Sequence, residues 1–329
     1  MLKRAGTVVL IGFALLFFCG AAMAEPILIR FSHVVSANDP KGVGALRFKE
    51  LAEARLADLV RVEVYPGSEL FTDELVLQGL LRGDVQLAAP SLSKFGSLTK
   101  RLLVFDLPFL FDDVEAVHAF QNGEVGQDLL TAMLDKGVLG LAYWDNGMRV
   151  VSGAKPLRTP ADAEGMTIRI EGSDVLEAQY RAIGALPMKL PFGEVYDALR
   201  SGLVQGQENT WSNIASQRFY TLGQSFTETS HSYLGYMVVT SAAFWNDLPE
   251  AVRTELEKIL VEVTQEVTQV AKERATSSRQ AVIDGGAEVI ELGTDERQRW
   301  VDAWKLVRDA FATEIGVHVV AAAEAAGAN

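Results

Sequence analysis

The sequence predicts an α/β protein in two halves, with the chain crossing between them, and three observations support this prediction. Short β-rich runs alternate with amphipathic helical segments along most of the chain. The 329 residues are 49% hydrophobic and 22% charged, which suits two domains of ordinary size. A helical pattern of about 37 residues, roughly 55 Å at 1.5 Å per residue, runs from Asp247 to Gly285. We expect this helix either to brace both halves or to be kinked.

The first 24 residues have the pattern of a secretory signal peptide. Lys3 and Arg4 precede an apolar run at residues 8–18, and Ala22-Met23-Ala24 supplies the small residues of a cleavage site. A membrane anchor is the weaker interpretation, because a spanning helix needs roughly 20 apolar residues. We expect cleavage after Ala24 and a mature protein in the periplasm.

The cysteine content indicates the compartment of the protein, and the charge argues against one class of partner. The only cysteine is Cys19, and the bulky Phe17 and Phe18 before it argue against lipid attachment there. A mature chain without thiols suits an oxidising compartment. Loss of residues 1–24 shifts the formal net charge from −13 to −15. Nucleic-acid binders carry a basic footprint, so this acidic chain is not expected to bind nucleic acid.

The residues after the signal peptide predict a parallel sheet. Alternation, β-rich composition and the Pro66-Gly67 stop indicate strands at 27–33, 60–65 and 85–89. Amphipathic patterns indicate helices at 42–58 and 73–81. A βαβαβ order of this kind implies parallel strands with right-handed crossovers.

The middle of the chain predicts a second series of strands and helices. We expect strands at 138–144, 166–170 and 204–207, and helices at 173–183 and 193–201. Residues 149–151 are expected to begin a crossover between the halves.

The C-terminal region is expected to be helical. Asp247 can cap the long helix, Pro249 suits its first turn, and Gly285-Gly286 ends it. A last helix is expected at 294–315, followed by an alanine-rich tail that we expect to fray.

Motifs for catalysis and for metal or cofactor binding are missing from the sequence. The four histidines form no HExxH pair, and neither a GxSxG elbow nor a GxxxxGK loop is present. Lys41-Gly42-Val43-Gly44 begins like a dinucleotide fingerprint but lacks its third glycine. We therefore expect no enzyme activity, metal or cofactor. A secreted hydrolase or lyase that uses paired carboxylates is the alternative.

Polar residues gather where the predicted strands end, which is where open α/β sheets bind ligands. They are Ser32, His33, Ser91, Ser93, Lys94, Asn146, Arg149 and residues 207–209, and Arg169 lies between Ile168 and Ile170. Taken alone, an arginine in a strand is more often a solvent-facing residue of an amphipathic sheet. Aromatic residues such as Trp144, Phe192 and Tyr236 are more often core than ligand contacts.

Several stretches together resemble the solute-binding proteins of TRAP transporters, the DctP family. The matching stretches include Gly206-Gln207-Glu208-Asn209 and follow the family's order from about residue 27 to 315. The others are residues 31–35, 40–42, 62–66, 89–95, 105–111, 144–149, 168–169 and 191–199.

This resemblance implies a two-lobed periplasmic binding protein-like fold, with hinge strands and a long bracing helix. Lobe I would hold residues 25–146 and about 235–275, and lobe II residues 147–234 and about 276–329. The lobes would close over one small organic acid anion, with a C4-dicarboxylate as the expected ligand. The partners implied are the small and large membrane subunits of a permease driven by an ion gradient. The protein itself would be a monomer without catalytic turnover.

The resemblance also implies ligand-binding residues. Arg169 matches an arginine that pairs with a ligand carboxylate, which a planar guanidinium can hold through two parallel hydrogen bonds. Arg149 matches a second arginine near the ligand, and Asn209 matches an asparagine that hydrogen-bonds the same carboxylate. Phe192 matches an aromatic residue packing beside the ligand. The remaining residues of the predicted site are Ser91 and Lys94 at the distal end, His33 and Lys41 near the cleft, and Trp211, Asn213 and Tyr236.

The sequence departs from the family pattern in two places. Many members read Asp-Gly-Gln-Glu-Asn-Pro-Leu at residues 205–211, where this chain loses the proline at Thr210 and gains a tryptophan at Trp211. Asp39 stands where histidine is common. Trp211 is either plain packing or part of a roomier pocket for an aromatic or larger carboxylate. A subunit that presents its ligand to a sensor is a further alternative.

Overall fold

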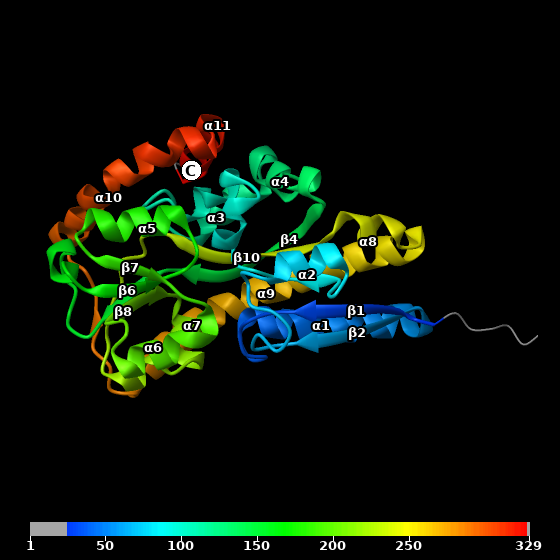
Figure 1. The fold of residues 1–329 in the computed structure, drawn as a ribbon, viewed down its shortest axis with the longest axis horizontal. Coiled ribbons are helices and arrows are strands. Elements are labelled where there is room, and N and C mark those ends of the chain that lie inside the picture. Colours follow the sequence, from blue (N-terminus) through cyan, green and yellow to red (C-terminus); the bar gives the residue numbers. More distant parts are fainter. Residues whose placement is uncertain (1–24, 328–329) are drawn as a thin grey trace, which may run out of the picture.

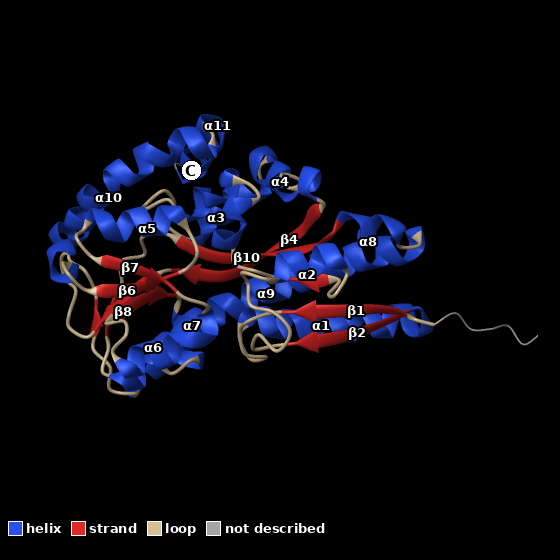
Figure 2. Ribbon diagram, in the orientation of Figure 1, coloured by secondary structure: helices blue, strands red, loops and turns tan. Residues whose placement is uncertain are grey.

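Two β-sheets organise residues 25–327, which the computed structural model describes (Figures 1 and 2). The predicted signal peptide lies outside these residues. Each sheet is covered by helices, so the structure has the predicted mixed α/β, two-lobed architecture.

The first sheet has the strand order β2-β1-β3-β10-β4. The predicted parallel arrangement is confirmed, because β1 pairs in parallel with both β2 and β3. The long strand β10 runs antiparallel between β3 and β4. The elements are β1 (Ile27–Ser32), α1 (Pro40–Leu56), β2 (Val60–Tyr65), α2 (Val76–Arg82), β3 (Leu87–Ala88), β4 (Val138–Met148) and β10 (Tyr233–Ser241).

The second sheet has the order β11-β9-β5-β8-β6-β7. Strand β6 pairs in parallel with β7 and β8, whereas β5 runs antiparallel to β8 and β9. The elements are β5 (Val150–Gly153), β6 (Thr167–Ile170), α5 (Asp174–Ala182), β7 (Leu186–Lys189), α6 (Val195–Ser201), β8 (Gly206–Asn209), α7 (Trp211–Ser216), β9 (Ser225–Thr227) and β11 (Val289–Ile290).

The chain crosses between the sheets at three places. Arg149 alone separates β4 of the first sheet from β5 of the second, so the crossover predicted at 149–151 is confirmed. Residues 228–232 lead back from β9 to β10. The third crossing is the helix α9 (Glu250–Asp284), which follows α8 (Ala242–Asp247).

The long helix braces both halves. Helix α9 is one continuous element of 35 residues and packs against α1 and β4 on one side of the molecule and α7 on the other (Figure 1). Its buried residues recur every three or four positions, as an amphipathic helix requires. They include Val252, Leu256, Ile259, Val263, Val267 and Ala271.

The C-terminal residues are more ordered than expected. Helix α10 (Thr294–Ile315) is followed by α11 (Val317–Gly327), so the prediction of a frayed tail is wrong. Gly316 separates the two helices with a φ of 112°, a conformation that favours glycine. Alanine is a strong helix former, and α11 buries Val319, Val320 and Ala323.

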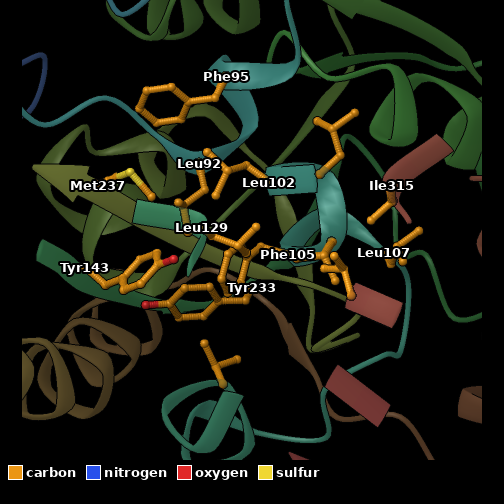
Figure 3. Close-up of a cluster of buried hydrophobic side chains, with 14 of the residues drawn as sticks. Leu92, Phe95, Leu102, Phe105, Leu107, Leu129, Tyr143, Tyr233, Met237 and Ile315 are labelled. Carbon is orange, nitrogen blue, oxygen red and sulfur yellow. The ribbon is translucent and has the colours of Figure 1, made fainter. Parts of the chain in front are cut away.

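Helix α11 packs against α3 (Val114–Asn122), which precedes α4 (Glu124–Leu130). The largest hydrophobic cluster lies around this contact and the first sheet. It joins Leu92, Phe105, Leu129 and Met237 to Ile315 of α10 (Figure 3). At its other end, α10 packs against α5. The exact division of the chain between the two lobes stays a prediction.

Candidate functional site

The structure brings many of the predicted site residues to a buried cluster where the two sheets meet. Ser91 follows β3 of the first sheet, and Glu171 follows β6 of the second. The Ser91 hydroxyl donates a hydrogen bond of 3.0 Å to Glu171 Oε2, so the two lobes touch here. We call this region the interlobe cluster. It comprises Lys41, Asp73, Ser91, Ser93, Lys94, Asp106, Arg149, Arg169, Glu171, Glu208 and Asn209.

Arg169 is a fixed and fully buried charge. Its side chain is 0% exposed, and its Nε and Nη2 donate to the carbonyl oxygen of Leu190 at 3.1 and 2.8 Å. Burial lowers its pKa, yet an arginine remains protonated in proteins. Within residues 25–327, its Nη1 has no hydrogen-bond partner. This atom is therefore a positioned donor for an anion.

Asn209 has a fixed amide orientation. Its Oδ1 accepts hydrogen bonds from the Thr210 backbone at 3.1 Å and from Asn213 Nδ2 at 2.6 Å. Because the oxygen already has two donors, Nδ2 is the atom that can donate to a ligand. Strands β6 and β8 are neighbours, and Arg169 is in register with Gln207, two residues before Asn209. Side chains two residues apart share one face of a sheet, so Arg169 and Asn209 face the same side.

Arg149 is also 0% exposed, but its surroundings differ. Its Nη1 donates to Glu208, and its Nη2 donates to Ser93 Oγ at 2.9 Å. Nη2 also lies 2.8 Å from Glu171 Oε2 and 3.3 Å from Asp106 Oδ1. Of the three guanidinium nitrogens of Arg149, only Nε lacks a hydrogen-bond partner within the described residues. Most of the hydrogen-bonding capacity of Arg149 is therefore used within the protein.

The charges in this network shift one another's pKa values. Burial would lower the pKa of Arg149, but Glu208, Glu171 and Asp106 outweigh burial and raise it. Burial would raise the pKa of Glu171, but Arg149, Lys94 and Arg169 hold it below its usual range. Burial raises the pKa of Glu208 despite Arg149. The network thus holds at least one firmly ionised carboxylate among the cations.

The first lobe contributes two lysines to the interlobe cluster. The Lys41 ammonium donates to the carbonyl oxygen of Ala89 at 2.8 Å and lies 3.8 Å from the centre of the Tyr236 ring. Burial lowers its pKa, and Asp73 and Glu171 oppose that shift. The Lys94 ammonium lies 2.5 Å from Glu74 Oε1.

Tyr236 and His33 lie beside Lys41. The Tyr236 hydroxyl accepts a hydrogen bond of 2.7 Å from Asn146 Nδ2. His33 is buried, and in the part of the chain that the structure describes neither of its ring nitrogens has a partner. Burial, with the nearby charge of Lys41, lowers the pKa of His33 to about 3. His33 is therefore neutral at physiological pH and supplies no charge to an anion.

Two of the three aromatic residues of the predicted site, Phe192 and Trp211, pack within the second lobe. Phe192 is partly buried and meets the edge of Phe219 at 6.4 Å between ring centroids. Trp211 is 8% exposed and packs against Phe226 at 5.9 Å. Trp211 also lines a separate cavity of about 470 Å³ beside α9, together with Met148 and Ala271. The surroundings of Trp211 are those of a packing residue.

Sequence reasoning missed the acidic half of the interlobe cluster. Glu171 could have been found, because it directly follows a predicted strand and lies two residues after Arg169. Glu208 lies in the polar stretch 207–209 at a predicted strand end, where the family resemblance points only to its neighbour Asn209. Asp73 and Asp106 gave no comparable signal, because Asp106 meets Arg149 across 43 residues of chain.

The arrangement suits an organic anion held between two lobes. The cluster contains four buried cations, and desolvating an anion is costly unless its charges are paired. Within residues 25–327, no group of three or more His, Cys, Asp or Glu side chains has the arrangement of a metal site. None of the described helices has the length and apolar character needed to cross a membrane.

Comparison with protein families gives a match over most of the chain. The profile of the family described as bacterial extracellular solute-binding protein, family 7, also called DctP, matches residues 31–314. A C4-dicarboxylate-binding periplasmic protein DctP of Vibrio cholerae is 45% identical over 312 residues, 94% of each chain. A 2,3-diketo-L-gulonate-binding periplasmic protein of Escherichia coli is 30% identical over 291 residues, 87% of this chain and 88% of the relative.

Solved structures show the same fold. A TRAP periplasmic solute-binding protein of Shewanella oneidensis with bound succinate is 48% identical, with a TM-score of 0.90 over 92% of this chain and 99% of that one. A TRAP periplasmic solute-binding protein of Pseudomonas aeruginosa with bound L-malate is 46% identical, with a TM-score of 0.85 over 87% and 100%.

Proposed function

This chain belongs to the DctP family of bacterial extracellular solute-binding proteins, and from that membership we propose that it binds a C4-dicarboxylate between its lobes. The observation that carries the proposal is the buried guanidinium of Arg169, which Leu190 fixes and whose Nη1 is unpaired within the described residues. Relatives at 46–48% identity hold succinate and L-malate, which are C4-dicarboxylates.

In the proposed complex, one ligand carboxylate binds Arg169 Nη1 and the amide of Asn209. Asn213 supports Asn209 through its hydrogen bond of 2.6 Å. Lys41, Lys94 and Ser91 come from the opposite lobe and attract the second carboxylate. Phe192, His33 and Tyr236 complete the walls. Arg149 contributes through its Nε and by positioning the carboxylates around it.

A larger aromatic ligand gains no support from the surroundings of Trp211. Its ring packs on Phe226 and faces a cavity beside α9. The interlobe cluster itself is lined by charged and amide groups, which suits a compact dianion.

The proposed role is delivery rather than catalysis. After cleavage behind Ala24, the mature protein would act as a monomer in the periplasm. It would carry its ligand to the small and large membrane subunits of a TRAP permease, without chemical turnover. Lobe closure would enclose the anion. The ligand would shift the balance between the open and closed states by the difference between its binding free energies in those two states.

Substitution of Arg169 tests this proposal directly. We expect Arg169→Ala to weaken binding of succinate and L-malate by about 2–5 kcal/mol, because the ligand carboxylate loses its buried partner. Isothermal titration calorimetry on the mature chain, residues 25–329, measures the loss.

Arg200→Ala is the matched control, because this arginine is 65% exposed and its ion pair, with Asp197, lies on the surface. Its affinity should equal that of the unmodified chain. An Arg169→Ala protein that remains folded by circular dichroism and binds with unchanged affinity would refute the proposed site.

A further inference from the structure

Glu171 places a negative charge in the middle of a site for anions. It interacts electrostatically with all four cations of the interlobe cluster, namely Lys41, Lys94, Arg149 and Arg169. Those cations keep it ionised, because they hold its pKa below the usual range. A ligand bound among these cations therefore lies close to a carboxylate.

The two oxygens of this carboxylate have different surroundings. Oε2 accepts from the Ser91 hydroxyl at 3.0 Å and from Arg149 Nη2 at 2.8 Å. Among residues 25–327, both hydrogen bonds to this carboxylate end on Oε2. Oε1 therefore keeps its capacity to accept, and an ionised carboxylate can accept but not donate.

We propose that Glu171 Oε1 selects for a C4-dicarboxylate that carries a hydroxyl group beside one of its carboxylates. This inference rests on the proposed function, whose ligand class it narrows. The hydroxyl of such a ligand donates to Oε1 and satisfies it. An unsubstituted dicarboxylate offers only C–H groups there, so it leaves Oε1 unpaired next to a like charge. Sites built to hydrogen-bond a hydroxyl discriminate strongly against analogues that lack it.

The surrounding charges favour a hydroxyl over an ammonium group as the donor. Both could donate to Oε1, but an ammonium would also face Lys41, Lys94, Arg149 and Arg169. Like charges at close range disfavour one another. A neutral hydroxyl avoids this repulsion, so a 2-hydroxy acid such as malate fits better than a 2-amino acid such as aspartate.

A ligand series on the unmodified mature chain tests the inference without any substitution. The ligands are L-malate, D-malate, succinate, fumarate and L-aspartate, measured by isothermal titration calorimetry at one pH and salt concentration. We expect one enantiomer of malate to bind at least about tenfold more tightly than succinate or fumarate. Equal binding of malate and succinate would overturn the inference, and so would tighter binding of aspartate than of malate.

Glu171→Gln tests the residue itself. The amide oxygen must stay on Ser91 and Arg149, which both donate to it, so the new NH₂ group replaces Oε1. This group donates to a carboxylate and cannot accept from a hydroxyl. We expect the preference for malate to disappear and the affinity for succinate to rise.

Glu74→Gln is the control for charge alone, because Glu74 pairs with Lys94 and is 38% exposed at the edge of the cluster. Its loss should alter the affinities for malate and succinate by the same factor and leave their ratio unchanged. A malate preference that survives in Glu171→Gln would overturn the inference. If Glu171→Gln does not fold, the ligand series decides alone.

The outcomes separate this inference from the proposed function. If succinate and malate bind equally well, the proposed function stands and the role of Glu171 falls. If no C4-dicarboxylate binds the unmodified chain, both fall.

Discussion

Arg149 and Arg169 are both fully buried, yet their guanidinium groups have different partners. Arg149 meets three carboxylates, whereas Arg169 meets a single carbonyl group. Three carboxylates fix most of the Arg149 guanidinium and leave only its Nε unpaired among the described residues, whereas Arg169 keeps its Nη1 for a ligand carboxylate. The distinction depends on Asp106, Glu171 and Glu208, which approach from separate parts of the chain.

His231 is a buried histidine whose protonation affects the stability of the fold. Its Nδ1 bonds Thr229 Oγ1 at 2.7 Å, and its ring lies 4.9 Å from that of Trp304. Burial, aided by the charge of Arg149, lowers its pKa to about 3. In the unfolded chain the pKa returns to about 6.5. The stability contributed by neutral His231 is therefore fully present above pH 6.5 and is lost as the pH falls toward 3.

We expect His231 to lower the free energy of unfolding as the pH is lowered from 7 to 5, relative to a chain that lacks this imidazole. His231 should contribute up to about 1.4 kcal/mol per pH unit below 6.5. Urea denaturation at pH 7, 6 and 5 measures this dependence, and His231→Gln should reduce the slope. Equal slopes for the two proteins would contradict the assignment. His33 stays neutral for the same reason and adds a dependence of the same sign, whereas the raised pKa of Glu208 contributes the opposite sign.

At the scale of elements, helix α11 shows how a short apolar segment gains order from its contacts. Val319 is 0% exposed, while Val317, two residues earlier on the same helix, is 66% exposed. The two valines share a backbone environment but differ in burial.

We expect Val319→Asp to lower the free energy of unfolding by several kcal/mol, because it buries an unpaired charge against α3. Val317→Asp should change it by less than about 0.5 kcal/mol. Chemical denaturation of both variants measures the difference. Similar stability of the two proteins would show that α11 does not pack on α3 in solution.

Elements with a clear period were predictable, and elements defined by distant contacts were not. The alternation of residues 60–65 predicts β2 correctly, and the apolar spacing of α9 predicts a long helix. Strand β10 was missed because every one of its residues is buried, so no alternation marks it. Helix α11 was misjudged because its small apolar residues gain order from contacts with α3, α10 and residues 100–106.

The residues of the candidate site also differ in whether the sequence could predict them. Arg169 and Asn209 stand at or near strand ends and could be selected from the sequence, with the family resemblance. The carboxylates that form ion pairs with Arg149 could not be selected from the sequence, because their role depends on side chains that meet across the two lobes.

At the scale of the whole molecule, the two lobes enclose the interlobe cluster. Several polar atoms are buried there without a partner in the described residues, including Arg169 Nη1 and Arg149 Nε. Such atoms are costly in a closed protein unless a ligand or water satisfies them. The cost favours separation of the lobes when no ligand is bound.

We expect the radius of gyration of the mature chain to decrease when a C4-dicarboxylate is added. Small-angle X-ray scattering should give a ligand-bound profile that matches the structure described here and a more extended profile without ligand. Arg169→Ala should remain extended at ligand concentrations that close the unmodified chain. Identical profiles with and without saturating ligand would contradict closure.

The single residue between β4 and β5 has a mechanical consequence. The lobes can turn relative to each other only about their connections, and Arg149 is one of them. Atoms near a rotation axis move little. The ion pairs of the Arg149 guanidinium should therefore lengthen only slightly when the lobes turn. The Lys94 ammonium lies 3.6 Å from where a side chain at Gly172 would begin, and this contact does not sit at a connection. It joins the two lobes through side-chain space, so a turn that separates the lobes also separates the two sides of this contact.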